Sequence, residues 1–106
     1  MYIIKSIEQT CTMCPSQWEG KTKCGRLYYI RFRHGQLTVE ITTKPTDSDV
    51  LDEKFWDHCE MILQKSISYS DGYLSNTQMI KETKPVFKFP VKMVWAAKSH
   101  DERKGI

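Results

Sequence analysis

Two arginines placed two residues apart are the strongest candidates for chemistry in this chain. Arg31 and Arg33 belong to a run in which apolar and polar residues alternate, a pattern typical of a half-buried β-strand. Alternate side chains of a strand point to the same face, so the two guanidinium groups should lie side by side. Arginine binds phosphate and carboxylate groups through paired hydrogen bonds. The spacing therefore predicts a surface that binds an anionic ligand.

The run from residue 27 to residue 41 predicts a β-hairpin that turns at His34-Gly35. A two-residue turn needs positive φ at both positions, which glycine adopts easily and histidine tolerates better than most residues. On one face the register pairs apolar residues: Phe32 with Leu37, Ile30 with Val39, and Tyr28 with Ile41. On the other face it pairs Arg33 with Gln36, Arg31 with Thr38, and Tyr29 with Glu40. This second face is called the arginine face below.

The residues around the two arginines favour a ligand that carries a ring. Tyr29 could stack on a nucleobase, and glutamine and threonine side chains beside it could bond to the edge of that base. The predicted ligand-binding residues are Arg31, Arg33, Tyr29, Trp18, Glu19, Gln36 and Thr38. The expected ligand is a nucleotide signal or a stretch of single-stranded nucleic acid.

The turn before the hairpin decides where Trp18 and Glu19 lie. A two-residue turn at Cys24-Gly25 places Trp18 opposite Arg31, with the indole beside the guanidinium group. A three-residue turn with a bulge instead places Trp18 opposite Ile30 in the core, and Glu19 then joins the arginine face. Both arrangements are compatible with the sequence.

The same side chains also fit two other interpretations. Glu19 and Glu40 could form cross-strand ion pairs with the arginines on a solvated face, each pair contributing about 0.2–1 kcal/mol. Tyrosine, tryptophan and arginine also dominate the energetics of protein interfaces. A module that binds and inhibits a host protein, or that pairs with a second copy of the chain, is therefore an alternative.

Two of the four cysteines form a Cys-x-x-Cys pair, Cys11 and Cys14. This spacing lets two thiolates bind one zinc ion, and two further ligands are then needed. Cys24 and His34 lie at opposite ends of one predicted strand, about 33 Å apart at ~3.3 Å per residue, so they cannot share a metal. A zinc-stabilised small domain is kept as an alternative, whereas the simpler interpretation is a pair of reduced thiols in a loop and no cofactor.

Composition and motifs favour a small binding protein over an enzyme. The 106 residues suit one domain, and the net charge of +3 permits an anionic partner without requiring one. No serine or cysteine has a base and an acid at recognisable spacing, and no glycine-rich phosphate loop occurs. No apolar run approaches the roughly 20 residues of a membrane span. The N-terminal residues lack the pattern of a signal peptide, so we expect a cytoplasmic protein with no membrane partner.

These side chains should be positioned by an α+β domain of residues 1–98, followed by a flexible tail of residues 99–106. An antiparallel sheet of about four to six strands is expected, with strands at 2–7, 16–21, 26–33, 36–41, 86–89 and 91–97. Residues 8–15 should form a loop. Residues 75–83 are ambiguous and could form a short helix.

One main helix should pack on the apolar face of the sheet, from about Val50 to about Ser66. Asp47 or Ser48 could cap its start. Its buried stripe is predicted from apolar residues at helical spacing: Leu51, Phe55, Cys59, Ile62 and Leu63.

Residues 14–41, about a quarter of the chain, resemble a group of small, uncharacterised bacterial and tailed-phage proteins. The resemblance is carried by Cys14-Pro15-Ser16-Gln17-Trp18-Glu19-Gly20, by Gly25 and by residues 29–39. That group often has Asp-Gly where this chain has Cys24-Gly25, and an aromatic residue where it has His34. The resemblance implies a phage or bacterial origin and no activity. With a phage origin, sequestering a host defence nucleotide, as an anti-defence sponge, is a coherent role.

Overall fold

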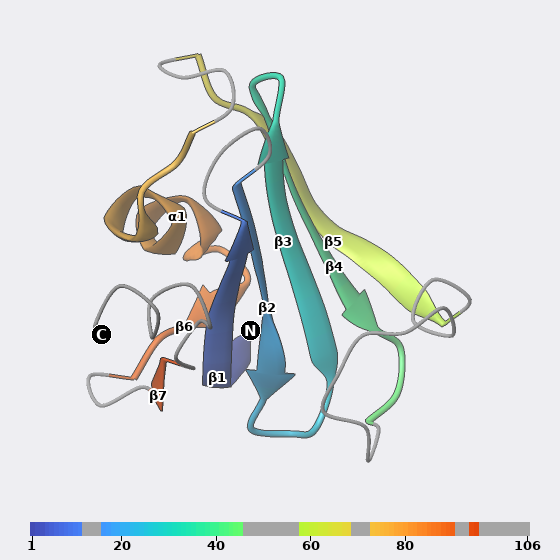
Figure 1. Ribbon diagram of the computed structural model, residues 1–106. Helices are drawn as coiled ribbons and strands as arrows, with labels where there is room; N and C mark the ends of the chain where they lie inside the picture. Colours follow the sequence, from blue (N-terminus) through green and yellow to red (C-terminus); the bar gives the residue numbers. More distant parts are fainter. Residues whose placement is uncertain (12–15, 46–57, 69–72, 91–93, 96–106) are drawn as a thin grey trace.

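Five consecutive strands form an antiparallel meander that makes up most of the fold. The computed structural model describes residues 1–11, 16–45, 58–68, 73–90 and 94–95, and the account below concerns these. The strands are β1 (Tyr2–Cys11), β2 (Ser16–Thr22), β3 (Leu27–Arg33), β4 (Gln36–Thr42) and β5 (Cys59–Ser66). Each pairs antiparallel with the next strand along the chain (Figure 1).

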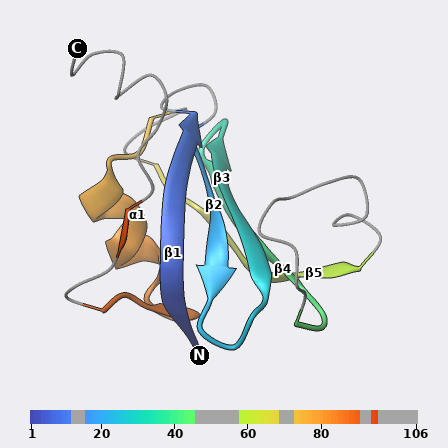
Figure 2. The same ribbon diagram turned by 60° about the horizontal axis from the view of Figure 1, so that its bottom comes forward.

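The chain then passes from one edge of the sheet to the other. From β5 it continues through helix α1 (Asn76–Thr83) to β6 (Phe87–Lys88), which pairs parallel with β1. Strand β7 (Val94–Trp95) also pairs parallel with β1. The order β5-β4-β3-β2-β1-β6 describes a mixed, curled sheet, with α1 lying to one side of it (Figures 1 and 2). The fold is broadly α+β, as predicted, but it consists mostly of sheet.

The hairpin predicted between residues 27 and 41 is confirmed in every pair. Strands β3 and β4 have the expected register, from Tyr28 opposite Ile41 to Arg33 opposite Gln36. His34 has φ of 52° and Gly35 has φ of 75°, as a two-residue turn of this type requires. The right-handed twist of the flanking strands matches such a turn, so local backbone geometry and side-chain pairing favour the same register.

The main helix predicted from about Val50 to about Ser66 is wrong over its second half, which is strand β5. Residues 46–57 lie outside the described residues. In the pairing of β4 with β5 the register shifts so that Ile62 has no partner, which is a β-bulge. Ile62 and Leu63 are consecutive apolar residues, which interrupts the alternation of a strand, and with Cys59 their spacing resembles that of a helix. Pairing with β4 outweighs the helix propensity of the residues in this segment.

The other predicted elements are largely confirmed with changed ends. The second strand lies where it was expected, and the ambiguous segment 75–83 forms α1. Strand β1 runs on to Cys11, so residues 8–11 are strand and not loop. The strand expected at 86–89 is the two-residue β6, and the one expected at 91–97 is described only as β7. Cys14, the helix caps at Asp47 or Ser48 and the tail 99–106 lie outside the described residues.

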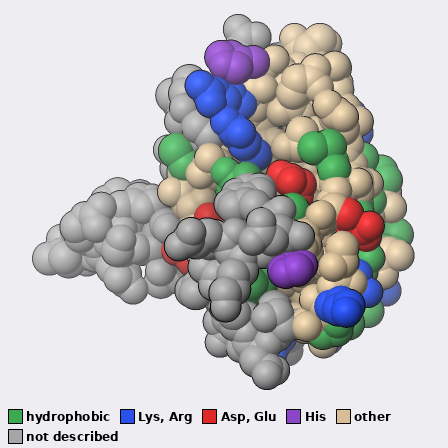
Figure 3. All heavy atoms as spheres, turned by 90° about the vertical axis from the view of Figure 1, so that its right-hand side faces the viewer, with side chains coloured by type: hydrophobic (Ala, Val, Ile, Leu, Met, Phe, Trp, Pro, Cys, Tyr) green, Lys and Arg blue, Asp and Glu red, His purple; other side chains and the backbone are tan. Residues whose placement is uncertain are grey.

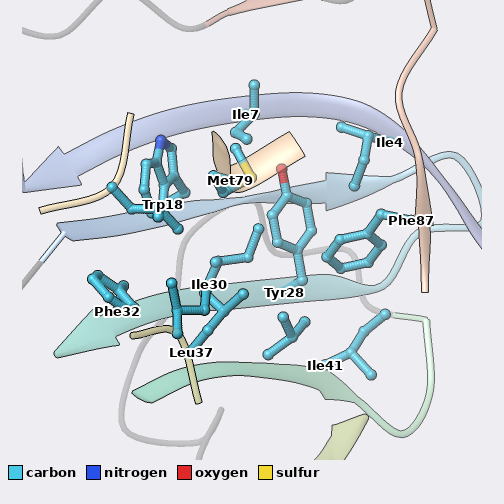
Figure 4. Close-up of a cluster of buried hydrophobic side chains, with 13 residues drawn as sticks. Ile4, Ile7, Trp18, Tyr28, Ile30, Phe32, Leu37, Ile41, Met79 and Phe87 are labelled. Carbon is cyan, nitrogen blue, oxygen red and sulfur yellow. The ribbon is translucent and has the colours of Figure 1, made fainter. Parts of the chain in front are cut away.

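Side chains of the apolar sheet face form one buried cluster with residues of α1 and β6. Figure 4 shows Trp18, Ile30 and Tyr28 of the sheet close to Met79 of α1 and Phe87 of β6. The buried cluster consists of Ile4, Ile7, Trp18, Tyr28, Ile30, Phe32, Leu37, Val39, Ile41, Ile67, Leu74, Met79 and Phe87. Burial of this apolar area is the main favourable contribution to folding.

Helix α1 is fixed at both of its ends. Ser75 and Gln78 form a capping box, in which the Ser75 hydroxyl accepts from the Gln78 amide and the Gln78 side chain accepts from the Ser75 amide. Near the other end, the Glu82 carboxylate lies 2.6 Å from the ammonium group of Lys65 in edge strand β5. An inward-pointing lysine on an edge strand also discourages pairing with another chain. Within the described residues, no helix is long and apolar enough to cross a membrane.

A close approach of three strands requires glycine at position 20. The Tyr28 hydroxyl donates a hydrogen bond of 2.8 Å to the carbonyl of Ser6, passing over Gly20. A Cβ atom at position 20 would lie 2.5 Å from the Tyr28 oxygen and would also collide with the Ser6 carbonyl. The tyrosine ring is fully buried, and burial raises the pKa of Tyr28 well above its usual value of 10.0.

We predict that Gly20→Ala lowers the free energy of unfolding by about 2–4 kcal/mol. Overpacking contributes about 1–3 kcal/mol of this, and the strained Tyr28–Ser6 hydrogen bond contributes the rest. Urea denaturation measures the change. In a Tyr28→Phe background the same substitution should cost less, because one colliding atom is gone. Strictly additive losses would show that the Tyr28 hydroxyl does not contribute to the constraint at position 20.

We further predict that Tyr28 makes the protein sensitive to alkaline pH. Its pKa is higher in the folded chain than in the unfolded chain, so the folded state retains the proton above about pH 10. The contribution of Tyr28 to the free energy of unfolding is fully present below the pKa that this tyrosine has in the unfolded chain. It decreases as the pH rises above that value, by at most about 1.4 kcal/mol per pH unit. Urea midpoints at about pH 9 and about pH 11 should therefore differ more in the natural protein than in Tyr28→Phe. Equal differences would contradict the prediction.

Candidate ligand-binding face

The arginine face is assembled from two neighbouring rows of side chains that cross the sheet from β1 to β5. The cross-strand register gives one row as Cys11, Gln17, Arg31, Thr38 and Gln64. It gives the next row as Glu8, Glu19, Tyr29, Glu40 and Met61. Beyond the second row, Leu27 of β3 is buried. The accessible part of the face therefore extends from Tyr29 toward the turn at His34.

Tyr29 occupies the centre of this face and is affected by the charges around it. Burial raises the pKa of Tyr29, the positive charge of Arg31 lowers it, and the negative charges of Glu19 and Glu40 raise it. The Cys11 thiol raises it as well. The phenol is therefore close to both an arginine and two carboxylates, and it remains protonated at neutral pH.

Arg31 is partly buried, and its Nε atom is buried without a hydrogen-bond partner. Arg26, which lies just outside β3, gives the contrast. Its guanidinium group stacks 5.4 Å from the centre of the Tyr2 ring and donates a 3.3 Å hydrogen bond to the carbonyl of Thr42. One arginine is thus bonded within the fold, whereas the other has an unsatisfied donor on the arginine face.

The remaining predicted residues of the hairpin lie where the register places them. Arg33 is exposed beside the turn, two residues along β3 from Arg31. Gln36 donates a 2.7 Å hydrogen bond to Ser66 of β5, and the Thr38 hydroxyl lies 3.5 Å from the backbone carbonyl of Arg31. Cross-strand ion pairs between the two arginines and Glu19 or Glu40 stay a prediction.

Trp18 does not belong to this face, because the turn before the hairpin has three residues. Thr22 donates from its amide to the carbonyl of Arg26, and Gly25 has φ of 91°, which gives a three-residue turn followed by a bulge. Trp18 therefore lies opposite Ile30, is fully buried, and donates a 2.8 Å hydrogen bond to the Asn76 side chain. The prediction of Trp18 as a ligand-binding residue is wrong.

Several members of the two rows were not predicted. Cys11 lies on the face because β1 is longer than expected and carries a bulge between Gln9 and Cys11, which alters the alternation of side chains. Met61 and Gln64 belong to β5, for which a helix was expected. Glu8 lies directly opposite Glu19, and that pairing depends on the register between β1 and β2. These residues could have been assigned to the arginine face from the sequence only if β1 and β5 showed a longer alternation of apolar and polar residues.

The cysteines do not form a metal site within the described residues. There, no group of three or more histidine, cysteine, aspartate or glutamate side chains is arranged to hold a metal ion. Cys11 lies on the arginine face and Cys59 donates to the Glu40 carboxylate at 3.6 Å, while Cys14 is outside the described residues. Zinc binding by Cys11 and Cys14 stays a prediction.

Charges of both signs are mixed on the side of the molecule that faces away from α1. Figure 3 shows Lys and Arg side chains next to Asp and Glu side chains on its coloured surface. A duplex-binding protein would carry a continuous basic stripe.

Comparison with known proteins gives no match: no family model fits the chain, and no curated protein or solved structure is significantly similar to it.

Proposed function

We propose that the arginine face binds an anionic, nucleotide-like ligand and that the protein is a non-enzymatic binding protein. The observation that carries the proposal is the buried Nε atom of Arg31, which has no hydrogen-bond partner. A buried donor without an acceptor costs about 1–3 kcal/mol, and more when the group is charged. A phosphate oxygen of a ligand would supply the acceptor and remove that cost once the Arg31 side chain turned outward to meet it.

The order of charges along β3 suggests how such a ligand is oriented. Arg31 and Arg33 lie two residues apart, about 6.6 Å at ~3.3 Å per residue, which suits the oxygens of one or two phosphates. Toward the other end of the face, Glu19 and Glu40 flank Tyr29. Their carboxylates would accept hydrogen bonds from sugar hydroxyls or base amino groups, and the phenol ring would contact the base. Both halves of a nucleotide thus have suitable partners.

A phage or bacterial origin, which the resemblance of residues 14–41 implies, would make sequestration of a host defence nucleotide a fitting role. Single-stranded nucleic acid offers the same phosphate and base chemistry, so the two sources must be separated by experiment. Binding of a polymer releases many counterions and weakens steeply with salt. A mononucleotide held by two arginines should show a shallow salt dependence.

We predict that Arg31→Ala weakens binding of nucleotide probes by about 10–100-fold, since hydrogen bonds to charged groups contribute about 1.5–3 kcal/mol. The melting temperature of the Arg31→Ala variant should differ little from that of the natural protein, because the substitution removes a donor, Nε, that has no partner in the fold. The probes are AMP, a cyclic dinucleotide and a short fluorescein-labelled oligothymidylate, measured by calorimetry or fluorescence anisotropy at low and high salt.

Arg26→Ala is the matched control and should behave in the opposite way. This arginine is bonded to Thr42 and stacked on Tyr2, so its loss should lower stability by about 0.5–1.5 kcal/mol and leave binding unchanged. If Arg31→Ala binds the probes as well as the natural protein does, the arginine face is not the site. If none of the probes binds the natural protein, the ligand is not nucleotide-like.

A protein partner is the second candidate, and Met61 is the observation that favours it. Its side chain is 50% exposed and lies in the same row as Tyr29 and Glu40. Methionine, tyrosine and arginine are enriched at protein interfaces. Met61→Ser should weaken such a complex and leave the binding of nucleotide probes intact, which separates the two functions.

A further inference from the structure

A hollow of about 320 Å³ lies between the end of α1, strand β6 and the first residue of the sequence. Its lining consists of Met1, Ile80, Lys84, Phe87, Lys88 and Phe89. None of these residues belongs to the arginine face, so the hollow is independent of the function proposed above. Its volume is at the lower end of the range of ligand pockets, about 300–1,000 Å³.

The walls of the hollow suit a flexible chain better than a flat ring. Phe87 is fully buried and forms the floor, and the ring of Phe89 lies 6.1 Å from it at an angle of 87°. Two perpendicular rings form a corner, in which a planar ligand could stack on only one of them. The remaining apolar lining comes from the flexible side chain of Met1 and the stiffer, β-branched side chain of Ile80. A hydrocarbon chain can bend to follow such a corner, whereas a flat ring cannot.

The polar part of the lining is cationic. Lys84, which caps the C-terminal end of α1, and Lys88 of β6 are both exposed, and the part of the lining that the structure describes includes no acidic side chain. An apolar pocket with a few polar groups at one place fixes the orientation of a ligand through those groups. Two ammonium groups beside an apolar corner fit an apolar chain that ends in a single anionic head.

A volume of about 320 Å³ is compatible with a ligand of about ten non-hydrogen atoms, at roughly 30 Å³ for each. We infer that this hollow binds a medium-chain carboxylate, with its hydrocarbon chain against Phe87, Phe89 and Ile80 and its carboxylate between Lys84 and Lys88. Octanoate has the matching size and is the probe of choice.

The test is a titration of the full-length, ¹⁵N-labelled protein with sodium octanoate, followed by NMR. Backbone amides of Ile80, Lys84 and residues 87–89 should shift in a saturable way, with a dissociation constant of roughly 0.1–1 mM. The double variant Lys84→Glu/Lys88→Glu should bind at least about tenfold more weakly, because both charge-assisted contacts become repulsive. These lysines are exposed, so the variant should fold normally.

Two controls make the outcome decisive. Lys81→Glu changes an exposed lysine of the same helix that does not line the hollow, and it should weaken binding clearly less than the double variant does, because solvent and salt partly screen a charge that does not contact the ligand. Octanol, which lacks the charge, should bind the natural protein and the double variant equally. Equal affinity of octanoate for the natural protein and the double variant would overturn the assignment, as would shifts that do not saturate or that centre elsewhere.

Discussion

The three-residue turn between β2 and β3 determines which side chains this protein buries and which it exposes. Gly25 adopts a φ of 91°, and the bulge that follows shifts β2 by one residue against β3 relative to a two-residue turn. Because side chains alternate between faces, a shift of one residue exchanges the entire core and surface sets of a strand. In this register Trp18 enters the core and Glu19 joins the arginine face. The composition of the candidate site thus depends on the backbone of one turn.

Bulges in β1 and β5 change the register of the strands that lie on either side of the central β2–β3–β4 pairing. In β1 the register shifts between Ile4 and Ser6 and again between Gln9 and Cys11. Each bulge adds a residue to one strand, which increases local twist and bends the sheet. The first bulge lies beside the carbonyl that Tyr28 contacts, and the second brings Cys11 onto the face that carries Arg31. Curvature of the sheet and membership of the arginine face therefore have the same cause.

The parts of the fold that could be predicted from the sequence are those determined by short-range signals. The hairpin was predictable because His34-Gly35 favours its turn and every pairing across it matches in polarity. The capping box of Ser75 and Gln78 is a similar local signal for α1. Strand β5 was not predictable, because its residues favour a helix and its bulge hides the alternation. The pairing of β6 and β7 with β1 joins residues that are far apart in sequence, and no local pattern indicates it.

The two faces of the sheet differ in how completely their polar groups are bonded. On the core side, the Tyr28 hydroxyl, the Trp18 indole and the Thr83 hydroxyl all donate to defined acceptors. Within the described residues, the buried side-chain atoms without partners are Arg31 Nε and the hydroxyl of Thr10. Thr10 directly precedes Cys11, which shares a row with Arg31, and it lies in the bulge between Gln9 and Cys11. Native proteins satisfy most buried polar groups, and exceptions call for a functional explanation. Because the core-side donors named above all have acceptors, the unpartnered Nε atom of Arg31 is the feature on which the proposed ligand binding rests.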